Sequence, residues 1–168
     1  MKILICYHSE TGNTEKVARA MQEALASEDV VLLPAAEVTQ ASLKDYDLVI
    51  VGSGVYGGTV GASIKALVKK ATELPPRFAF FLTHGANPAT SQGAFDLVRK
   101  GIEKAGSQVV GEFDCYGESF APYTMEERIA LFAPEERESA RAKIEGTRGH
   151  PDDEDLANAQ EFAKSLLG

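Results

Sequence analysis

The stretch Ser9-Glu10-Thr11-Gly12-Asn13-Thr14 decides the fold of this 168-residue chain, because it joins an apolar run to an amphipathic segment. Residues 2–7 before it read Lys-Ile-Leu-Ile-Cys-Tyr, a nearly continuous apolar run that is typical of a parallel strand covered on both faces. Residues 13–26 after it place Val17 and Met21 on one side at helical spacing. Such a turn presents free backbone N–H groups and the positive end of a helix dipole, which together suit a phosphate. An N-capped helix after a polar turn is the structural alternative, and it needs only one of these residues.

The side chains of this turn are short and polar. Most of them can donate or accept a hydrogen bond, and Gly12 lets the backbone approach a ligand or take a positive φ. The turn resembles the phosphate-binding loop of flavodoxins, which reads Thr/Ser-x-Thr-Gly-Asn-Thr at the end of the first strand, and it matches that pattern completely. The resemblance implies that Ser9, Thr11, Asn13 and Thr14 hold the phosphate of FMN. The resemblance implies that no cation is required at the phosphate, so Lys16 is not assigned to the phosphate site.

Strands and helices alternate along the rest of the chain. Apolar runs predict strands at residues 30–33, 47–52, 78–83 and 108–115, and helical repeats predict helices at residues 60–71, 95–105 and 152–167. Five alternations predict an α/β fold, a doubly wound five-stranded parallel sheet with helices on both faces and right-handed crossovers. The strand order 2-1-3-4-5 of the flavodoxin-like three-layer sandwich fits this pattern, and it places a ligand beyond the carboxyl ends of strands one and three.

The charged residues at about 124–149 depart from a minimal flavodoxin. We expect a single flavodoxin-like domain over residues 1–168 with a charged helical insertion at these positions. Thr124 and Glu127 resemble a capping box, and Pro134 is placed to open a second short helix. Two interpretations stay open: a solvated connection to the last helix, or a lid or partner-docking element over the flavin edge.

Three predicted loops, residues 9–14, 53–61 and 83–87, follow strands one, three and four and open at the same edge of the predicted sheet. Glycines allow backbone close to a flat ring, and a few polar groups at its edge complete such a site. The predicted cofactor-binding residues are Ser9, Glu10, Thr11, Gly12, Asn13, Thr14, Ser53, Gly54, Val55, Tyr56, Gly57, Gly58, Thr83, His84, Gly85, Ala86 and Asn87.

An aromatic residue stands in the second of these loops. The resemblance implies that Tyr56 packs against the isoalloxazine ring, with a surface tyrosine in a turn as the alternative. It also implies that a peptide at Gly57-Gly58 reorients when the flavin is reduced, which glycine permits. Phe120 and Tyr123 are weaker candidates for the other face of the ring.

Other site types receive little support from the sequence. Residues 52–57 fit the Gly-x-Gly-x-x-Gly dinucleotide fingerprint, but the next helix starts several residues later and the acidic ribose partner is missing. His8 and His84 are expected roughly 10 Å apart, too far to share a metal ion without further ligands. His150 precedes a proline and is interpreted as structural. No metal site and no catalytic set is predicted, and Cys6 and Cys115 are expected to be buried free thiols.

Composition narrows the function. A formal net charge of -8 argues against a nucleic-acid surface and suits a basic protein partner. No apolar run reaches the roughly 20 residues of a membrane span, and no signal peptide is evident, so we expect a cytoplasmic protein, monomeric or weakly dimeric. The sequence predicts an FMN-binding electron carrier between redox proteins. The alternatives are an FMN-dependent NAD(P)H or quinone reductase on the same fold, and a non-redox binding module.

Overall fold

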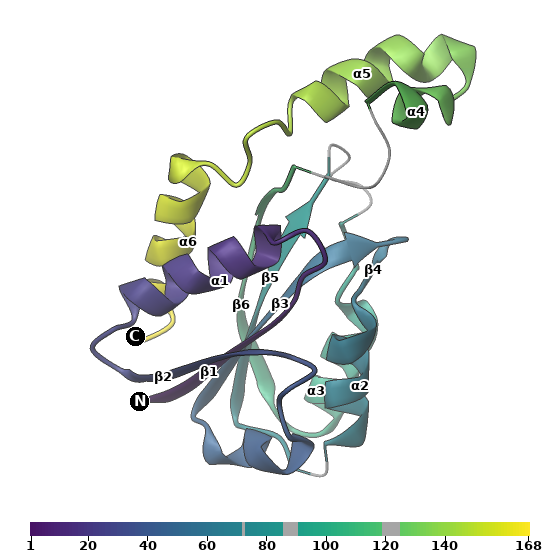
Figure 1. Ribbon diagram of the computed structural model, residues 1–168. Helices are drawn as coiled ribbons and strands as arrows, with labels where there is room; N and C mark the ends of the chain where they lie inside the picture. The colour runs from purple at the N-terminus through teal and green to yellow at the C-terminus, as the bar shows by residue number, and fades with distance from the viewer. Residues whose placement is uncertain (72, 86–90, 119–124) are drawn as a thin grey trace.

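A parallel sheet with helices on both of its faces forms the body of the protein, as the computed structural model shows for residues 1–71, 73–85, 91–118 and 125–168 (Figure 1). The strands are β1 (Lys2–His8), β2 (Asp29–Pro34), β3 (Leu48–Tyr56), β4 (Thr59–Val60), β5 (Arg77–His84) and β6 (Gln108–Tyr116). The helices are α1 (Asn13–Ala24), α2 (Ala62–Lys70), α3 (Asp96–Lys104), α4 (Met125–Ala130), α5 (Arg137–Glu145) and α6 (Asp153–Ser165), with short 3-10 turns at Gln40–Asp45 and Pro134–Glu136. None of these helices is long and apolar enough to cross a membrane.

The strand order is β2-β1-β3-β5-β6, and these five strands run parallel. This confirms the predicted order 2-1-3-4-5, because β4 is a two-residue addition that pairs only with the end of β3. In the β1–β3 pair, Tyr7 lies beside Gly52 and His8 beside Ser53. The first predicted loop therefore begins beside the start of the second predicted loop.

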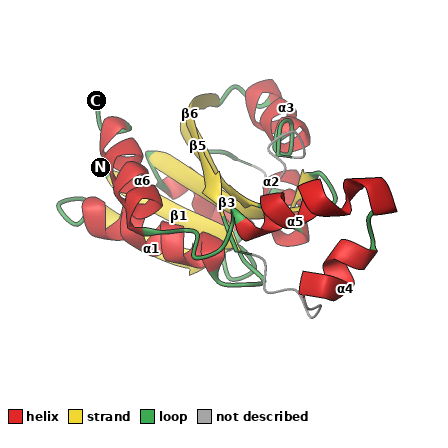
Figure 2. Ribbon diagram, turned by 90° about the horizontal axis from the view of Figure 1, so that it is seen from above, coloured by secondary structure: helices red, strands yellow, loops and turns green. Residues whose placement is uncertain are grey.

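Side chains from each central strand alternate between two hydrophobic cores. Leu4 and Val49 pack under α2 and α3, whereas Ile3 and Ile50 pack under α1 and α6. Figure 2 shows these two helix pairs on opposite sides of the sheet. Burial on both faces explains why the strands read as continuous apolar runs. Each fully buried large side chain, such as Phe78, contributes roughly 1.5–3 kcal/mol.

The second predicted loop, residues 53–61, is wrong in its secondary structure. β3 continues to Tyr56 and turns back into β4 through Gly57 and Gly58, whose φ angles are 59° and 79°. Two central residues with positive φ form the tight hairpin turn that glycine favours. Gly52 serves packing instead, because a Cβ there would lie 1.9 Å from the ring of Phe81. Gly52 therefore gives space within β3, and Gly57 and Gly58 form the turn that follows it. The sequence pattern alone does not distinguish such a strand and hairpin from a glycine-rich loop.

The charged residues fold into a pair of helices, α4 and α5, that projects beyond the carboxyl ends of β3 and β5 (Figure 1). We call this pair the arm. Ile129 of α4 and Ala140 of α5 are buried between the helices, and Arg141 donates to both carboxylate oxygens of Glu126 at 2.7 and 2.8 Å. Hydrogen bonds from this guanidinium lower the pKa of Glu126. Pro134 opens the 3-10 turn before α5, as predicted, whereas Thr124 of the predicted capping box lies outside the described residues.

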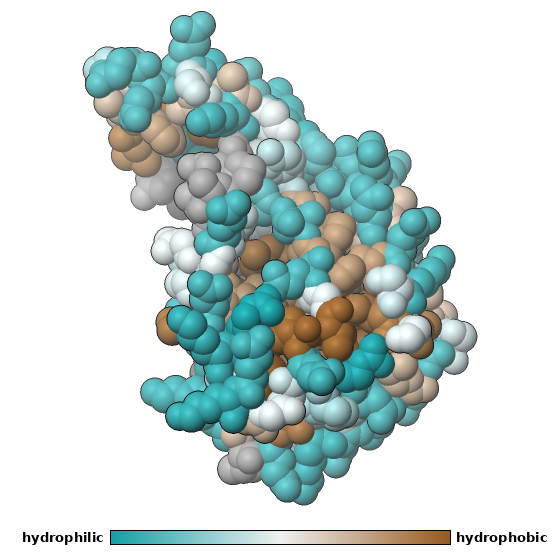
Figure 3. Space-filling view, turned by 180° about the vertical axis from the view of Figure 1, so that it is seen from behind, coloured by the Kyte–Doolittle hydropathy of each residue, from teal (hydrophilic) through white to brown (hydrophobic). Residues whose placement is uncertain are grey.

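The surface of the arm differs from that of the body. In Figure 3 the arm is mostly hydrophilic with one small hydrophobic area, while hydrophobic side chains gather over the body. Among its described residues, Leu131 and Phe132 are exposed large hydrophobic side chains, with 78% and 41% of their surface accessible.

Candidate functional site

The turn between β1 and α1 leaves the N-terminus of the helix open. Gly12 occupies the N-cap position with φ 90°, and as a glycine it has no side chain to cap the helix. The first bond within the helix runs from the N–H of Lys16 to the carbonyl of Gly12 at 2.9 Å. The N–H groups of the first helical turn, Asn13 to Glu15, therefore have no acceptor within the helix. The alternative of an ordinary side-chain cap does not describe this turn.

The rest of the turn is held by its own side chains. The N–H of Gly12 donates to Ser9 Oγ at 3.1 Å, and Asn13 Nδ2 donates to Thr11 Oγ1 at 3.1 Å. A Cβ on Gly12 would meet nothing within 4 Å, so glycine is needed here for its backbone angle and not for space. The result is a preformed loop with its helical amides directed outward.

A buried hydroxyl pair links this loop to the end of β5. Thr14 Oγ1 and Thr83 Oγ1 lie 2.8 Å apart, and both residues are buried. The pair joins the first predicted loop to the third. Because a hydroxyl has two acceptor lone pairs and one proton, each can still interact with a further polar group.

Tyr56 leans back over the first loop. Its hydroxyl accepts the N–H of Glu10 at 3.3 Å, and its ring lies edge-on to His8 with centroids 5.2 Å apart. A Cβ on Gly54 would come within 2.8 Å of this hydroxyl, so Gly54 makes room for the ring. Burial raises the pKa of Tyr56. Tyr56 is thus part of the loop cluster rather than an isolated surface residue.

The two strand-end histidines are held by different partners. His8 Nδ1 lies 2.7 Å from Ser63 Oγ, and His84 Nε2 lies 2.8 Å from Asp114 Oδ2. The buried ring of His84 also hydrogen-bonds through Nδ1 with the carbonyl of Gly85 at 2.9 Å. These contacts orient both rings at the carboxyl edge of the sheet.

Residues from all three predicted loops meet around a cavity of about 240 Å³. We call it the loop cavity. Its lining residues are Thr11, Asn13, Thr14, Gly54, Val55, Tyr56, Thr83, His84, Gly85, Gly117 and Arg128.

Several predicted residues fall outside that lining. Ser53 is fully buried, and its hydroxyl accepts the N–H of Gly61 at 2.9 Å, so it holds the β3–β4 hairpin. Ser9, Glu10 and Gly12 shape the first loop, and Gly57 and Gly58 form the hairpin turn. Ala86 and Asn87 lie outside the described residues, as do Phe120 and Tyr123.

Sequence reasoning missed two lining residues, Gly117 and Arg128. Gly117 follows β6, and a Cβ there would lie 2.9 Å from Asn13 Nδ2. Gly117 could have been predicted from its position at the end of a parallel strand beside β5, because ligands bind at that edge of such sheets. Arg128 comes from α4 of the arm, and nothing in its local sequence indicates that it reaches the sheet edge.

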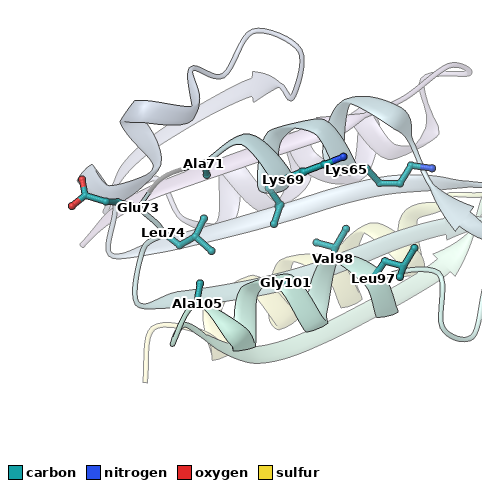
Figure 4. A pocket seen from close by; sticks show the side chains of 10 residues that line it. Lys65, Lys69, Ala71, Glu73, Leu74, Leu97, Val98, Gly101 and Ala105 are labelled. Atoms are coloured by element: carbon teal, nitrogen blue, oxygen red, sulfur yellow. The ribbon is translucent and has the colours of Figure 1, made fainter.

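A larger cavity of about 850 Å³ lies between α2 and α3 (Figure 4). Apolar side chains such as Val68, Leu74 and Val98 line most of it, with Lys65 and Lys69 at its border. Pockets that bind small molecules usually add convergent polar groups to an apolar wall. The loop cavity has such groups, so we assign the site to it despite its smaller volume.

Cys6 and Cys115 are buried free thiols, as the sequence predicts. Burial raises the pKa of each thiol to about 12. Protonated and buried thiols are poor nucleophiles, so neither contributes a reactive group to the site.

The fold and the loop cavity together define a class of protein: a doubly wound α/β protein with a glycine-capped helix N-terminus at the carboxyl edge between β1 and β3. A family model described as a flavodoxin domain matches residues 4–164. The chain therefore belongs to the flavodoxin family.

Relatives and solved structures agree with this assignment. The chain is 29% identical over 168 residues to an uncharacterized protein of Methanocaldococcus jannaschii, with 99% of both chains covered. It is 28% identical over 123 residues to a flavodoxin of Picosynechococcus, covering 69% of this chain and 72% of that one. The crystal structure of oxidised flavodoxin 2 from Bacillus cereus has a TM-score of 0.70 at 21% identity, covering 99% and 98%. A flavoprotein of Lactobacillus acidophilus in complex with FMN has a TM-score of 0.52 at 20% identity, covering 67% and 92%.

Proposed function

We propose that this protein binds FMN at the loop cavity and carries electrons between redox proteins. The observation that supports this best is the uncapped N-terminus of α1, which sits beside the Thr14–Thr83 hydroxyl pair. A dianionic phosphate suits backbone N–H groups at the positive end of a helix dipole. Membership of the flavodoxin family and the FMN complex of the Lactobacillus acidophilus flavoprotein add support.

The residues present fit each part of FMN. The open amides of the first turn of α1, with the hydroxyls of Thr11 and Thr14, would hold the phosphate. Tyr56 offers the flat surface for the isoalloxazine ring, and the carbonyl of Gly54 or Gly85 can accept at its polar edge. The cavity of about 240 Å³ is smaller than sites that enclose a whole ligand, which are roughly 300–1,000 Å³. A partly exposed flavin edge is what electron transfer to another protein requires.

When bound, FMN supplies the electron chemistry, and the chain tunes it by binding, packing and charge. Tyr56 would exclude water from one face of the ring. Glu10 of the first loop and Asp114, paired with His84, place negative charge near the site. Negative charge disfavours further electron uptake, so these carboxylates would lower the reduction potential. The positive φ angles of Gly57 and Gly58 would let a peptide there reorient with little strain.

The proposed partners are basic redox proteins, because the chain carries a formal net charge of -8. We propose that the protein works in the cytoplasm as a monomer or weak dimer. Opposite charge raises the rate of encounter, and this acceleration falls as salt is added.

Three measurements test the proposal in turn. Purified protein that shows the visible absorption of bound flavin, or acquires it on addition of FMN, supports the cofactor; protein that does neither is a non-redox binding module. Multiple turnover with NAD(P)H and a quinone identifies a reductase. A carrier gives no such turnover, but its reduced flavin passes electrons stoichiometrically to an acceptor protein, faster at low salt.

A further inference from the structure

The arm brings a cation to the cofactor site. Arg128 is the one lysine or arginine among the described residues that line the loop cavity. The resemblance of the first loop to flavodoxins implies phosphate binding without a cation, and Lys16 follows that expectation because its Nζ donates to the carbonyl of Pro151 at 2.5 Å. Arg128 therefore departs from the cation-free phosphate site that the resemblance implies, and it belongs to the insertion.

The base of the arm is tied to the phosphate loop through Glu118. Asn13 Nδ2 donates to the carbonyl of Glu118 at 2.6 Å. The N–H of Glu118 donates to the carbonyl of His150 at 2.7 Å, and its carboxylate accepts the N–H of Gly149 at 2.9 Å. Residues before and after the arm thus meet at one residue, and that residue is bonded to the loop. The chain segments on either side of the arm are therefore held next to the first loop.

Packing within the arm sets the direction of Arg128. Glu126 is bound to Arg141, and Ile129 is buried, so these two positions of α4 face α5. Residues three apart share a face of a helix, whereas Arg128 lies on another side. That side borders the loop cavity.

Resting on the proposed function, we infer that Arg128 binds the phosphate of FMN and makes the site selective for FMN over riboflavin. Oxidised FMN carries its charge on the phosphate. Guanidinium groups pair with phosphate oxygens through two parallel hydrogen bonds, which are stronger than bonds between neutral groups. The amides of α1 would bind the phosphate from one side and Arg128 from another.

The test compares two ligands and three variants. Cofactor-free protein is titrated with FMN and with riboflavin, following the quenching of flavin fluorescence. Arg128→Gln should raise the Kd for FMN roughly 10- to 100-fold and leave the Kd for riboflavin within about twofold. Arg128→Lys should recover part of the FMN affinity, because it keeps the charge and loses the paired geometry. Lys143→Gln removes an equal charge from an exposed position of α5 and should change neither Kd.

Each outcome separates the inference from the proposed function. An FMN affinity that is equal in wild type and Arg128→Gln overturns the inference and leaves FMN binding intact. An equal loss for FMN and riboflavin also overturns it, since the arginine would then act at the ring or through the fold. Wild-type protein that binds neither flavin removes the proposed function itself, and the inference with it. A circular dichroism spectrum unchanged from wild type confirms that the variants fold.

Discussion

Two helices that pack against each other, α1 and α6, begin in opposite ways. At α6 the carboxylate of Asp152 accepts the N–H groups of Glu154 and Asp155, each at 3.0 Å, and Asp155 accepts the N–H of Asp152 in return at 2.9 Å. At α1 the N-cap is Gly12, which has no side chain to accept the N–H groups of the first turn. A helix with its amides satisfied by its own chain has no need of a ligand, whereas one left open can bind an anion.

The capped N-terminus of α6, which we call the closed terminus, also accounts for a cluster of side chains that resembles a metal site. Potential ligand atoms of His150, Asp152 and Asp155 lie within 4.8 Å of one another. Asp152 and Asp155 already cap α6, and His150 Nδ1 lies 2.6 Å from Asp155 Oδ2. The cluster is explained by helix capping, in agreement with the structural interpretation of His150. The N-terminus of α1 differs in having a glycine at the N-cap and in the convergence of two further loops upon it.

The largest effect should come from placing a negative charge at the open terminus. Gly12→Asp puts a carboxylate at the N-cap of α1, where it repels the phosphate and competes for the helical amides. We expect the Kd for FMN to rise roughly 100-fold or more. Gly12→Ala is the matched control, because it imposes the same unfavourable φ without charge and meets no neighbouring atom. Equal losses in the two variants would show that backbone angle, and not the open amides, governs binding.

The second largest effect is expected in the Thr14–Thr83 hydroxyl pair, where variants can separate a role in FMN binding from a role in folding stability. Thr14→Val removes one partner of a buried pair and leaves Thr83 unsatisfied, so unfolding free energy should fall by about 1–3 kcal/mol. FMN affinity should fall roughly tenfold. Thr14→Val combined with Thr83→Val should recover much of the stability and none of the affinity. Recovery of both, measured by urea unfolding and flavin titration, would show that Thr14 acts only through the fold.

Breaking the closed terminus should affect stability alone. Asp152→Ala removes the cap of α6 and should lower the melting temperature by roughly 2–5 °C while leaving the Kd for FMN unchanged. A change in FMN affinity as large as that of Thr14→Val would remove the distinction between the two helices.

Acid should abolish that stability difference. The hydrogen bond from the N–H of Asp155 lowers the pKa of Asp152 below its usual 3.8. A carboxyl with a depressed folded pKa stabilises the protein above its unfolded pKa, and the contribution is lost as pH falls through the folded value. The melting temperatures of wild type and Asp152→Ala should therefore differ at neutral pH and converge below pH 3.8. A difference in melting temperature between wild type and Asp152→Ala that stays constant as pH falls would contradict an ionised cap.

The smallest effect is expected in the larger cavity between α2 and α3. Leu97 lines it with 73% of its surface exposed, so Leu97→Ser removes little buried apolar surface. FMN affinity and melting temperature should both stay close to wild type. A clear loss of flavin binding in Leu97→Ser would indicate that the flavin binds in the cavity between α2 and α3. It would contradict the assignment of the site to the loop cavity, which rests on the polar groups there.

The sequence was sufficient for the elements whose determinants are local. Apolar runs such as residues 2–7 mark strands buried on both faces, and the residues 9–14 loop carries its phosphate-binding pattern in six consecutive positions. The alternation of strands and helices predicted a parallel sheet, and the flavodoxin-like strand order that fits this pattern is the one observed. The three loops then converge because parallel strands end at the same edge.

The features that the sequence did not predict depend on contacts between distant residues. Gly52 is required by the ring of Phe81 on the neighbouring strand, and its pattern alone is equally compatible with a loop. Arg128 of α4 lines the loop cavity, and Glu118, which precedes the arm, accepts a hydrogen bond from Asn13 of the first loop. The contacts Gly52–Phe81 and Asn13–Glu118 join residues 29 and 105 positions apart, and no local propensity encodes them.

Titration of cofactor-free protein with FMN decides whether the N-terminus of α1 binds the cofactor. We expect quenching of flavin fluorescence with one FMN per chain, tight binding of FMN, and loss of that binding in Gly12→Asp but not in Asp152→Ala. Absence of quenching in the wild-type protein, or equal quenching in the wild type and Gly12→Asp, would contradict this expectation.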